Sequence, residues 1–204
     1  RSRGLGDVYK RQEDAYTLNQ PGTKFPSHTD RKLTPGVDLT TGSLGQGVST
    51  ATGAALGNKI DGRDSTVFCV IGDGEADEGQ VWEGFHFAYA HKLDNIIYFI
   101  DNNGYQLDGS TDDILAHGDI AKKVEGFGLH TQVIDGHDVT AIYEAIQKAK
   151  ETKGVPSCIV LTTSKGKGAT FAEPKHDHSS QPKEEQWLEA IAASEKELEA
   201  AKNA

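Results

Sequence analysis

Methionine is absent from all 204 residues, and cysteine occurs only twice. Each cysteine lies inside an apolar run, Cys69 in "VFCVI" and Cys158 in "SCIVL". Two thiols in separate buried strands are typical of reduced core residues, so we expect neither a disulfide nor a metal role for them. This use of cysteine favours a cytoplasmic protein.

Long apolar runs and clusters of positive charge are also missing. No run approaches the roughly 18 apolar residues that a membrane span needs. The chain carries 21 Lys and Arg against 31 Asp and Glu, which gives a formal net charge of -10. Basic residues form no cluster longer than a pair. We therefore expect no nucleic-acid partner and no membrane partner.

The first twelve residues differ from the rest of the sequence. Residues 1–12 are basic, whereas the remainder is acidic, and they have neither a starting Met nor the apolar centre of a signal peptide. We interpret residues 1–12 as adapter-derived sequence foreign to the protein. Residues 13–204 are then expected to form one domain whose own N-terminal part is missing.

Apolar runs alternate with helical patterns along this domain. The runs at 65–72, 95–101, 129–135 and 156–163 predict strands, and they are continuous rather than alternating, which is typical of parallel strands buried on both faces. The expected fold is α/β, a parallel sheet with helices on both faces. The predicted helices span 44–59, 79–93, 119–128, 137–154 and 183–204.

Three predicted helices carry an apolar face that we expect to pack inward. The helix at 44–59 has small residues instead, which predicts close packing against a neighbour. The three apolar faces consist of Val81, Phe85 and Ala88; of Val139, Ile142, Ile146 and Ala149; and of Trp187, Ile191 and Leu198.

The acidic stretch "GDGEADEG" at 72–79 follows the first predicted strand directly. Asp73 and Asn103 are 30 residues apart, with one turn, one helix and one strand between them. A right-handed crossover would place them on neighbouring parallel strands, at the edge where α/β sheets bind ligands. Their oxygens suit Mg²⁺ or Ca²⁺, and Gly72 and Gly74 allow a phosphate to approach the backbone. Each motif taken alone is more typical of a turn, whereas the two motifs together, each after a buried strand and one βαβ unit apart, are much more specific for a metal site.

Five stretches together resemble transketolases, specifically the N-terminal subunit of the split form. They are "TPGVDLTTGSLGQGVS", "GDGEADEGQVWEG", "HKLDNIIYFIDNNGYQLDG", "DGHD" and "SKGKG", and the resemblance runs from about Tyr16 to the end. It implies the thiamine-diphosphate-binding fold, with thiamine diphosphate and Mg²⁺ (or Ca²⁺) as cofactors.

The resemblance also implies the residues of a cofactor site. The side chains of Asp73 and Asn103 and the main-chain carbonyl of Tyr105 match the metal ligands. Gly72 and Gly74 belong to the same motif, and the Gly74 N–H matches a diphosphate contact. The loop that lines the cofactor matches Gly42, Ser43 and Leu44.

Catalytic residues implied by the resemblance are two histidines and two acids. His28 matches a histidine that meets the donor substrate, and a second one is either His178 or His176, with His178 favoured by its distance from the next proline. Glu78 and Glu83 match acids that share protons across a dimer interface. A solvated position is the alternative for each of them.

The implied reaction transfers a two-carbon ketol unit from a ketose phosphate to an aldose phosphate, as in the pentose phosphate pathway. The implied partners are a C-terminal subunit with a pyrimidine-binding domain and a second copy of this chain, in a heterotetramer that binds sugar phosphates. The glutamate that activates the cofactor would belong to the partner, so we expect this chain alone to be inactive. The alternatives are a deoxyxylulose-phosphate synthase-like enzyme and a non-catalytic nucleotide- or metal-binding module.

Overall fold

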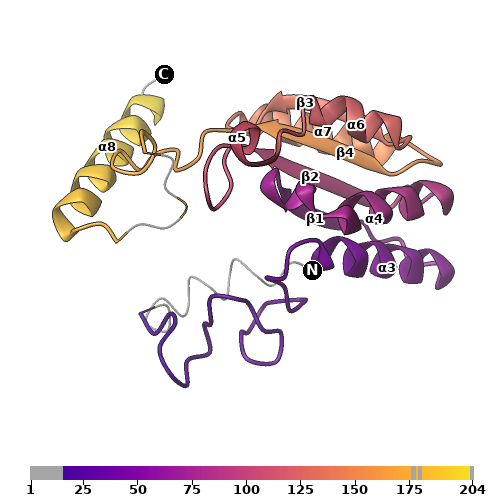
Figure 1. The fold of residues 1–204 in the computed structure, drawn as a ribbon, viewed down its shortest axis with the longest axis horizontal. Helices are drawn as coiled ribbons and strands as arrows, with labels where there is room; N and C mark the ends of the chain where they lie inside the picture. The colour runs from indigo at the N-terminus through magenta and orange to yellow at the C-terminus, as the bar shows by residue number, and fades with distance from the viewer. Residues whose placement is uncertain (1–15, 176–177, 179–180, 203–204) are drawn as a thin grey trace.

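The computed structural model describes residues 16–175, 178 and 181–202, so the prediction for residues 1–12 lies outside the described residues. A parallel sheet with helices on both faces confirms the α/β prediction (Figure 1). The strands are β1 (Val67–Gly72), β2 (Ile96–Asn102), β3 (His130–Asp135) and β4 (Ser157–Thr162). The helices are α3 (Gln46–Ile60), α4 (Gly79–Ala90), α5 (Thr111–Leu115), α6 (Ile120–Gly126), α7 (Val139–Glu151) and α8 (Glu184–Lys202), with a 3₁₀ turn η1 (Gly74–Asp77).

The strand order β1-β2-β4-β3 places the first two strands side by side. Strands β1 and β2 are parallel, and Gly72 is paired with Asp101. Both strands therefore end at the same edge of the sheet. This confirms the predicted return of the chain to a neighbouring strand after one crossover.

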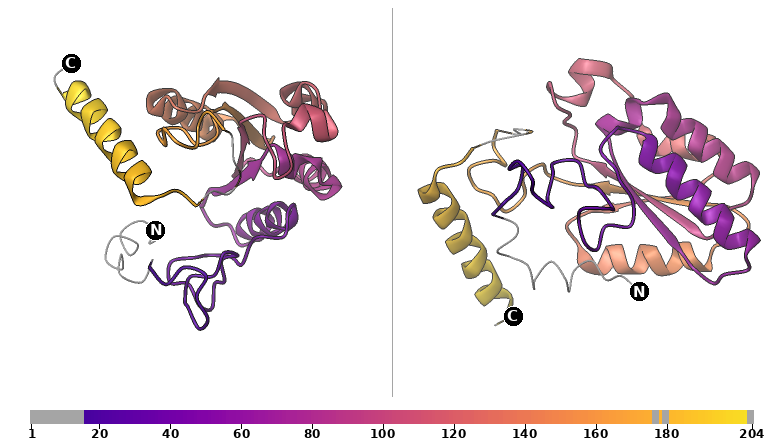
Figure 2. Two further views of the ribbon diagram at one scale, coloured as in Figure 1. Left: turned by 60° about the vertical axis from the view of Figure 1, so that its left-hand side comes forward. Right: turned by 90° about the horizontal axis from the view of Figure 1, so that it is seen from below.

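The core has two parts, one on each face of the sheet (Figure 2). The larger part lies between the sheet and helices α3, α4 and α6, and it includes the fully buried side chains of Val48, Phe85 and Tyr98. The smaller part lies under α7, where Ile97 and Ile159 are buried.

Helices α3 and α4 pack as closely as the small residues predict. A Cβ atom added to Gly84 would lie 2.7 Å from Val48 Cγ1, so only glycine fits there without movement. Beneath this contact the Thr52 and Tyr98 hydroxyls form a buried hydrogen bond of 2.6 Å. Helix α3 begins at Gln46 rather than at residue 44, because Gly45 has a left-handed backbone (φ +78°) that is not helical.

The prediction that all four strands are buried on both faces is wrong for the outer strands. Phe68 and Val70 of β1 are 48% and 71% exposed, and Val133 of β3 is 58% exposed. Helix α7 lies over β3 and β4, where Ile134, Ile159 and Leu161 belong to its part of the core, so its face of β1 stays uncovered. Val133 is paired with Val160, which belongs to the other part of the core, so Val133 is exposed on the opposite face of the sheet. The sequence pattern could not reveal where the covering helices stop.

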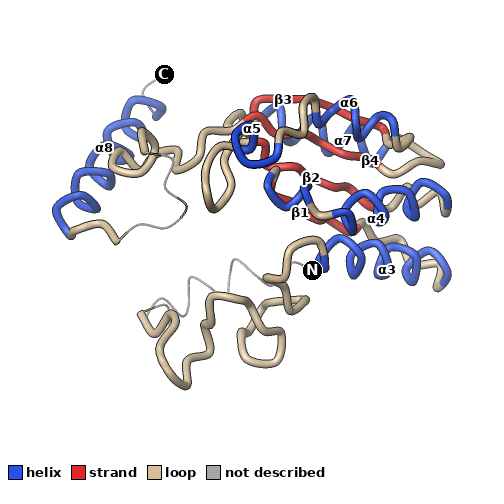
Figure 3. Tube along the Cα trace, in the orientation of Figure 1, coloured by secondary structure: helices blue, strands red, loops and turns tan. Residues whose placement is uncertain are grey.

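Two predicted helix faces also need correction. Val139 is 78% exposed because it is the first residue of α7 and lies before the helix reaches the sheet. Trp187, Ile191 and Leu198 are about half exposed, because α8 stands apart from the sheet and its helices (Figure 3). Helix α8 contacts the preceding loop instead, through the Phe171 and Trp187 rings, whose centroids are 4.9 Å apart. No helix in the described part of the chain is both long enough and apolar enough to cross a bilayer.

The two cysteines are buried and unpaired, as predicted. Burial, and to a smaller extent the negative charge of Glu75, raise the pKa of the Cys69 thiol to about 12. Burial likewise raises the pKa of Cys158. Both groups are therefore neutral thiols at physiological pH, which suits core residues rather than nucleophiles.

Asp94, which lies before β2, connects the end of α3 with the loop before β4. Its carboxylate accepts hydrogen bonds from Gly154 N (2.9 Å) and Lys59 Nζ (3.1 Å). Burial alone would raise the pKa of Asp94, but these two partners lower it below 3.8. We expect Asp94→Asn to lower the free energy of unfolding by about 1 kcal/mol near neutral pH, after allowance for partial exposure.

The pH dependence of this loss has a definite sign. A depressed folded-state pKa stabilises the protein above the unfolded value and stops doing so as the pH falls through the folded value. The difference in free energy of unfolding between Asp94→Asn and the unsubstituted chain, measured by urea denaturation, should therefore shrink as the pH falls below 3.8 and disappear below the lowered pKa of Asp94. Asp108→Asn, at an exposed loop position, is the control. A loss that persists at low pH would contradict this role of the charge.

Candidate functional site

Asp73 lies at the carboxyl edge of the sheet, directly after β1. Its N–H donates to the Asp101 carbonyl (3.1 Å), and its carboxylate accepts from Gly74 N (2.8 Å) and Gly104 N (2.5 Å). Asp73 thus contacts the residue that follows Asn103. The structure therefore brings Asp73 to the loop that carries Asn103, 30 residues later in the sequence.

Asp73 is 1% exposed, which makes its negative charge costly. Burial raises the pKa of Asp73, the hydrogen bonds from Gly104 and Gly74 lower it, and the nearby Asp101 raises it again. Among the described residues no Lys or Arg forms an ion pair with Asp73. A divalent cation would supply the missing positive charge, so the position fits a metal ligand.

The loop after β2 is a short hairpin. Asn103 Oδ1 accepts from Tyr105 N (3.0 Å), Tyr105 forms an antiparallel bridge with Ser110, and Gln106 N donates to the Gly109 carbonyl (2.9 Å). These bonds fix the amide oxygen of Asn103 and the carbonyl of Tyr105 near the end of β2. Within the described part of the chain, no three His, Cys, Asp or Glu side chains form a metal-binding group. The predicted ligands are one carboxylate, one amide oxygen and one main-chain carbonyl, so they do not require such a group of three side chains.

The glycine turn and the hairpin touch each other. A Cβ atom on Gly74 would lie 2.6 Å from Gln106 Cβ, so the hairpin can approach only a glycine here. The amide nitrogen Nε2 of Gln106 is buried without a hydrogen-bond partner. A buried donor without a partner is costly, and a bound anion is one way of satisfying it. No pattern in the sequence points to Gln106.

His28 lies against the predicted cofactor-lining loop, Gly42 to Leu44. A Cβ atom on Gly42 (φ +141°) would lie 1.8 Å from His28 Cδ2, so the ring occupies the space that any other side chain would need. Two hydrogen bonds between Thr29 and Thr41 hold the segments together, one between their hydroxyls (3.1 Å) and one from Thr41 N to the Thr29 carbonyl (3.3 Å). The structure thus brings His28 to the predicted cofactor-lining loop.

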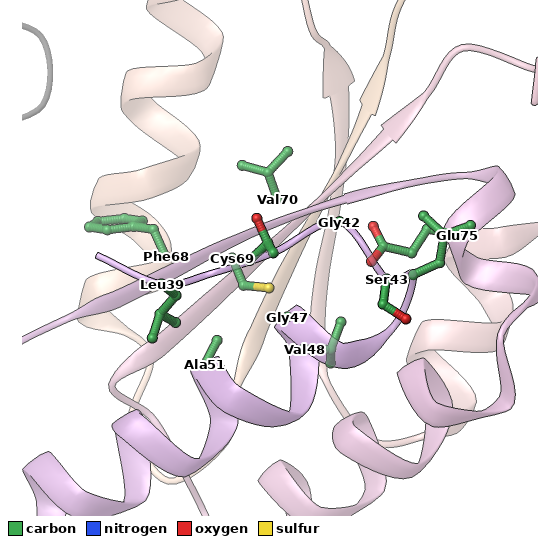
Figure 4. Close-up of a pocket in the computed structure, with 12 residues that line it drawn as sticks. Leu39, Gly42, Ser43, Gly47, Val48, Ala51, Phe68, Cys69, Val70 and Glu75 are labelled. Carbon is green, nitrogen blue, oxygen red and sulfur yellow. The ribbon is translucent and has the colours of Figure 1, made fainter. Parts of the chain in front are cut away.

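The cofactor-lining loop forms one wall of a cavity of about 290 Å³ (Figure 4). Gly42, Ser43 and Leu44 line it together with Val70 and Glu75. The cavity is therefore lined by the loop, by β1, by the first turns of α3 and by the acidic turn.

Glu75 and Asp77 are not solvated residues of the turn. Glu75 accepts hydrogen bonds from Gly45 N (2.8 Å) and Gly72 N (3.2 Å). Asp77 Oδ1 lies 3.4 Å from His117 Nδ1, and the two side chains are 15% and 7% exposed. No local pattern indicates a role for either acid, because one partner of each lies 30 or more residues away.

Glu78 and Glu83 are exposed in this chain. Glu78 ends η1 and precedes α4, beside Gly45, where a Cβ atom would lie 3.3 Å from Glu78 Cβ. Glu83 lines a cleft of about 320 Å³ between α3 and α4, together with Ser49 and Phe87. Their sharing of protons at a subunit interface stays a prediction.

His178 is exposed, and its Nδ1 lies 3.4 Å from Lys165 Nζ. No described contact joins His178 to Asp73 or His28, so the structure does not bring this histidine into the site. His176 lies outside the described residues.

Comparison with known proteins decides the family. The family described as "Transketolase, thiamine diphosphate binding domain" matches residues 9–195. The chain belongs to this family. Among relatives of this transketolase domain, the subunit SqwG of a 6-deoxy-6-sulfo-D-fructose transketolase from Clostridium sp. (strain MSTE9) is 48% identical over 182 residues, 89% of this chain and 66% of the relative.

Two further relatives show how much of a longer protein the transketolase domain represents. An apulose-4-phosphate transketolase subunit from Actinobacillus succinogenes is 36% identical over 82% of this chain and 60% of its own length. Human transketolase is 40% identical over 76% of this chain but 24% of its own length. The chain thus spans less than two thirds of the subunit-length relatives and about a quarter of the long one.

Solved structures agree with the sequence relationship. Transketolase from Campylobacter jejuni has a TM-score of 0.75 and 33% identity, covering 80% of this chain and 27% of that one. A Pichia stipitis transketolase complex with sedoheptulose 7-phosphate has a TM-score of 0.73 and 33% identity, covering 78% and 25%. The transketolase domain therefore shares both fold and sequence with these enzymes.

Proposed function

We propose that this chain is the N-terminal subunit of a two-subunit transketolase. The reaction is transfer of a two-carbon ketol unit from a ketose phosphate to an aldose phosphate. The observation that carries the proposal is the contact between the buried Asp73 and the hairpin of Asn103, within a domain of this family. The match to separate transketolase subunits supports the division into two polypeptides.

We assign the metal ligands to Asp73, Asn103 and the carbonyl of Tyr105, with Mg²⁺ (or Ca²⁺) as the ion. The burial of Asp73 without a Lys or Arg partner among the described residues supports this, since one carboxylate and two neutral oxygens suit a hard cation that also binds phosphate. Gly72 and Gly74 leave room for the diphosphate. Thiamine diphosphate, when bound, supplies the carbanion chemistry that protein side chains lack.

The remaining residues handle the substrate and its protons. His28 is proposed to hydrogen-bond a hydroxyl of the donor sugar, and its contact with Gly42 supports this role. His178 is proposed to meet the substrate once the active site is complete. Glu78 and Glu83 are proposed to share protons where two copies of the chain meet, since close carboxylates cannot all ionise comfortably.

The proposed partners complete the site. A C-terminal subunit would bring the pyrimidine-binding domain and the glutamate that activates the cofactor, and pairing with a second copy would give a heterotetramer. We also propose that the enzyme acts in the cytoplasm and in the pentose phosphate pathway. The two buried thiols support a reducing compartment.

A coupled ketol-transfer assay tests this function. The complete gene product, its C-terminal partner, thiamine diphosphate and Mg²⁺ should together release aldose phosphate from a ketose phosphate, whereas each polypeptide by itself should give no turnover. Because one relative is named for a sulfo-sugar, the donor panel should include 6-deoxy-6-sulfo-D-fructose beside ketose phosphates. Tight cofactor binding without transfer from any donor would favour a non-catalytic binding module instead.

A further inference from the structure

The half-buried side chain of Glu75 joins three parts of the site. One carboxylate oxygen accepts from Gly45 N (2.8 Å), and the other accepts from Gly72 N (3.2 Å). Gly45 directly follows the cofactor-lining loop, and Gly72 directly precedes Asp73. Glu75 itself belongs to the η1 turn. A single carboxylate thus connects the loop, the end of β1 and the acidic turn.

The two N–H groups need an acceptor of this kind. Gly45 precedes α3 with a left-handed backbone, and no side chain caps the helix from that position. Gly72 is the last residue of β1. A carboxylate has two oxygens that can each accept a hydrogen bond, and it binds N–H groups more strongly than a neutral acceptor. The neighbouring acid Asp77 cannot replace it, because Asp77 is paired with His117.

The orientation of Glu75 connects these bonds to the cavity. Glu75 lines the same cavity as Gly42, Ser43 and Leu44, and Figure 4 shows its carboxylate on the side of Ser43. The cofactor-lining loop and the metal turn are far apart in sequence, yet they would hold two ends of one cofactor. Their separation must therefore be set by a contact between them.

We propose that Glu75 is a positioning residue that fixes the cofactor-lining loop relative to the metal turn. The inference rests on the proposed function, because it concerns the same cofactor. A loop that is already held in its bound position loses less conformational freedom on binding, so the contact raises affinity for thiamine diphosphate. The packing of α3 on α4 through Gly84 does not involve Glu75, so the fold should survive its replacement.

The test compares Glu75→Ala and Glu75→Gln with Glu125→Gln, an exposed position on α6 with the same change of charge. Hydrogen exchange of the chain should show the Gly45 and Gly72 amides at least about tenfold less protected in Glu75→Ala, with core amides unchanged. Calorimetry on the two-subunit enzyme should show affinity for thiamine diphosphate with Mg²⁺ reduced about 30-fold. Glu75→Gln keeps one acceptor oxygen, so its affinity for the cofactor should lie between those of Glu75→Ala and the unsubstituted enzyme. The affinity of Glu125→Gln should equal that of the unsubstituted enzyme.

The outcomes separate this inference from the proposed function. If the unsubstituted enzyme does not bind the cofactor, the proposed function itself is wrong. If it binds and Glu75→Ala binds equally well, only the role of Glu75 is overturned. Should Glu75→Ala fail to fold, the nearly isosteric Glu75→Gln decides: unchanged affinity and unchanged protection of Gly45 would overturn the inference.

Discussion

Replacing Asp73 with asparagine is expected to lower the affinity for thiamine diphosphate with Mg²⁺ by at least about 100-fold, the upper end of the losses seen when outer-shell partners of metal ligands are removed. The substitution removes the one carboxylate of the proposed ligand set and keeps its size. Asp73 is 1% exposed, so no anion from solvent can take its place without moving the hairpin that holds Gly104.

Calorimetric titration with the cofactor, with and without Mg²⁺, measures this effect. Asp64→Asn is the matched control, because Asp64 is an exposed acid in the loop before β1, at the opposite edge of the sheet. Circular dichroism of both variants checks that they fold. Equal affinity of folded Asp73→Asn and the unsubstituted chain would remove the proposed metal site.

The second large effect concerns stability. Phe85→Ala should lower the free energy of unfolding by about 3 to 5 kcal/mol, since it removes a fully buried ring and leaves a cavity. Phe85 packs with its centroid 4.8 Å from that of Tyr98 and 5.7 Å from that of Trp82, in an edge-on arrangement with the latter. The cavity would lie between α4 and the strands that precede Asp73 and Asn103.

Phe87→Ala on the same helix is the control. Phe87 is 43% exposed and stacks on His91, with a centroid distance of 4.2 Å. Its removal should cost no more than about 1 kcal/mol. Urea denaturation of both variants gives the comparison, and similar losses for the two would show that the core does not lie where the structure has it.

The central part of the site follows from local patterns. Two continuous apolar runs, each followed by a polar turn, predict parallel strands, and the right-handed crossover then leaves little choice for where Asp73 and Asn103 lie. Local sequence also predicts the inward face of α4, because Val81, Phe85 and Ala88 repeat with the helical period. All three side chains are fully buried.

Other features depend on contacts that no local pattern contains. Glu75 reaches Gly45 across 30 residues, and Asp77 meets His117 across 40. A run of acids on a turn gives no sign of such partners. The proximity of His28 to Gly42 was expected only through the family resemblance, since the intervening segment has neither a helical nor a strand period.

Solvent exposure is the property that the sequence pattern predicts least well in this chain. An apolar stripe such as Trp187, Ile191 and Leu198 indicates that a face prefers burial, but it does not indicate what covers it. Among the described residues, the ring contact of α8 is with Phe171 in the loop before it, and these side chains stay half exposed. The same holds for Val70, which an apolar strand pattern alone would place in a core.

Strand β1 ends the row of described strands, and Phe68 and Val70 are uncovered there. Edge strands of natural sheets often carry a lysine, a proline or a bulge, because an unprotected edge strand can pair with a strand of another molecule. The β1 segment "VFCVIG" contains neither lysine nor proline. An uncovered apolar strand of this kind favours aggregation until another part of the protein or a partner covers it.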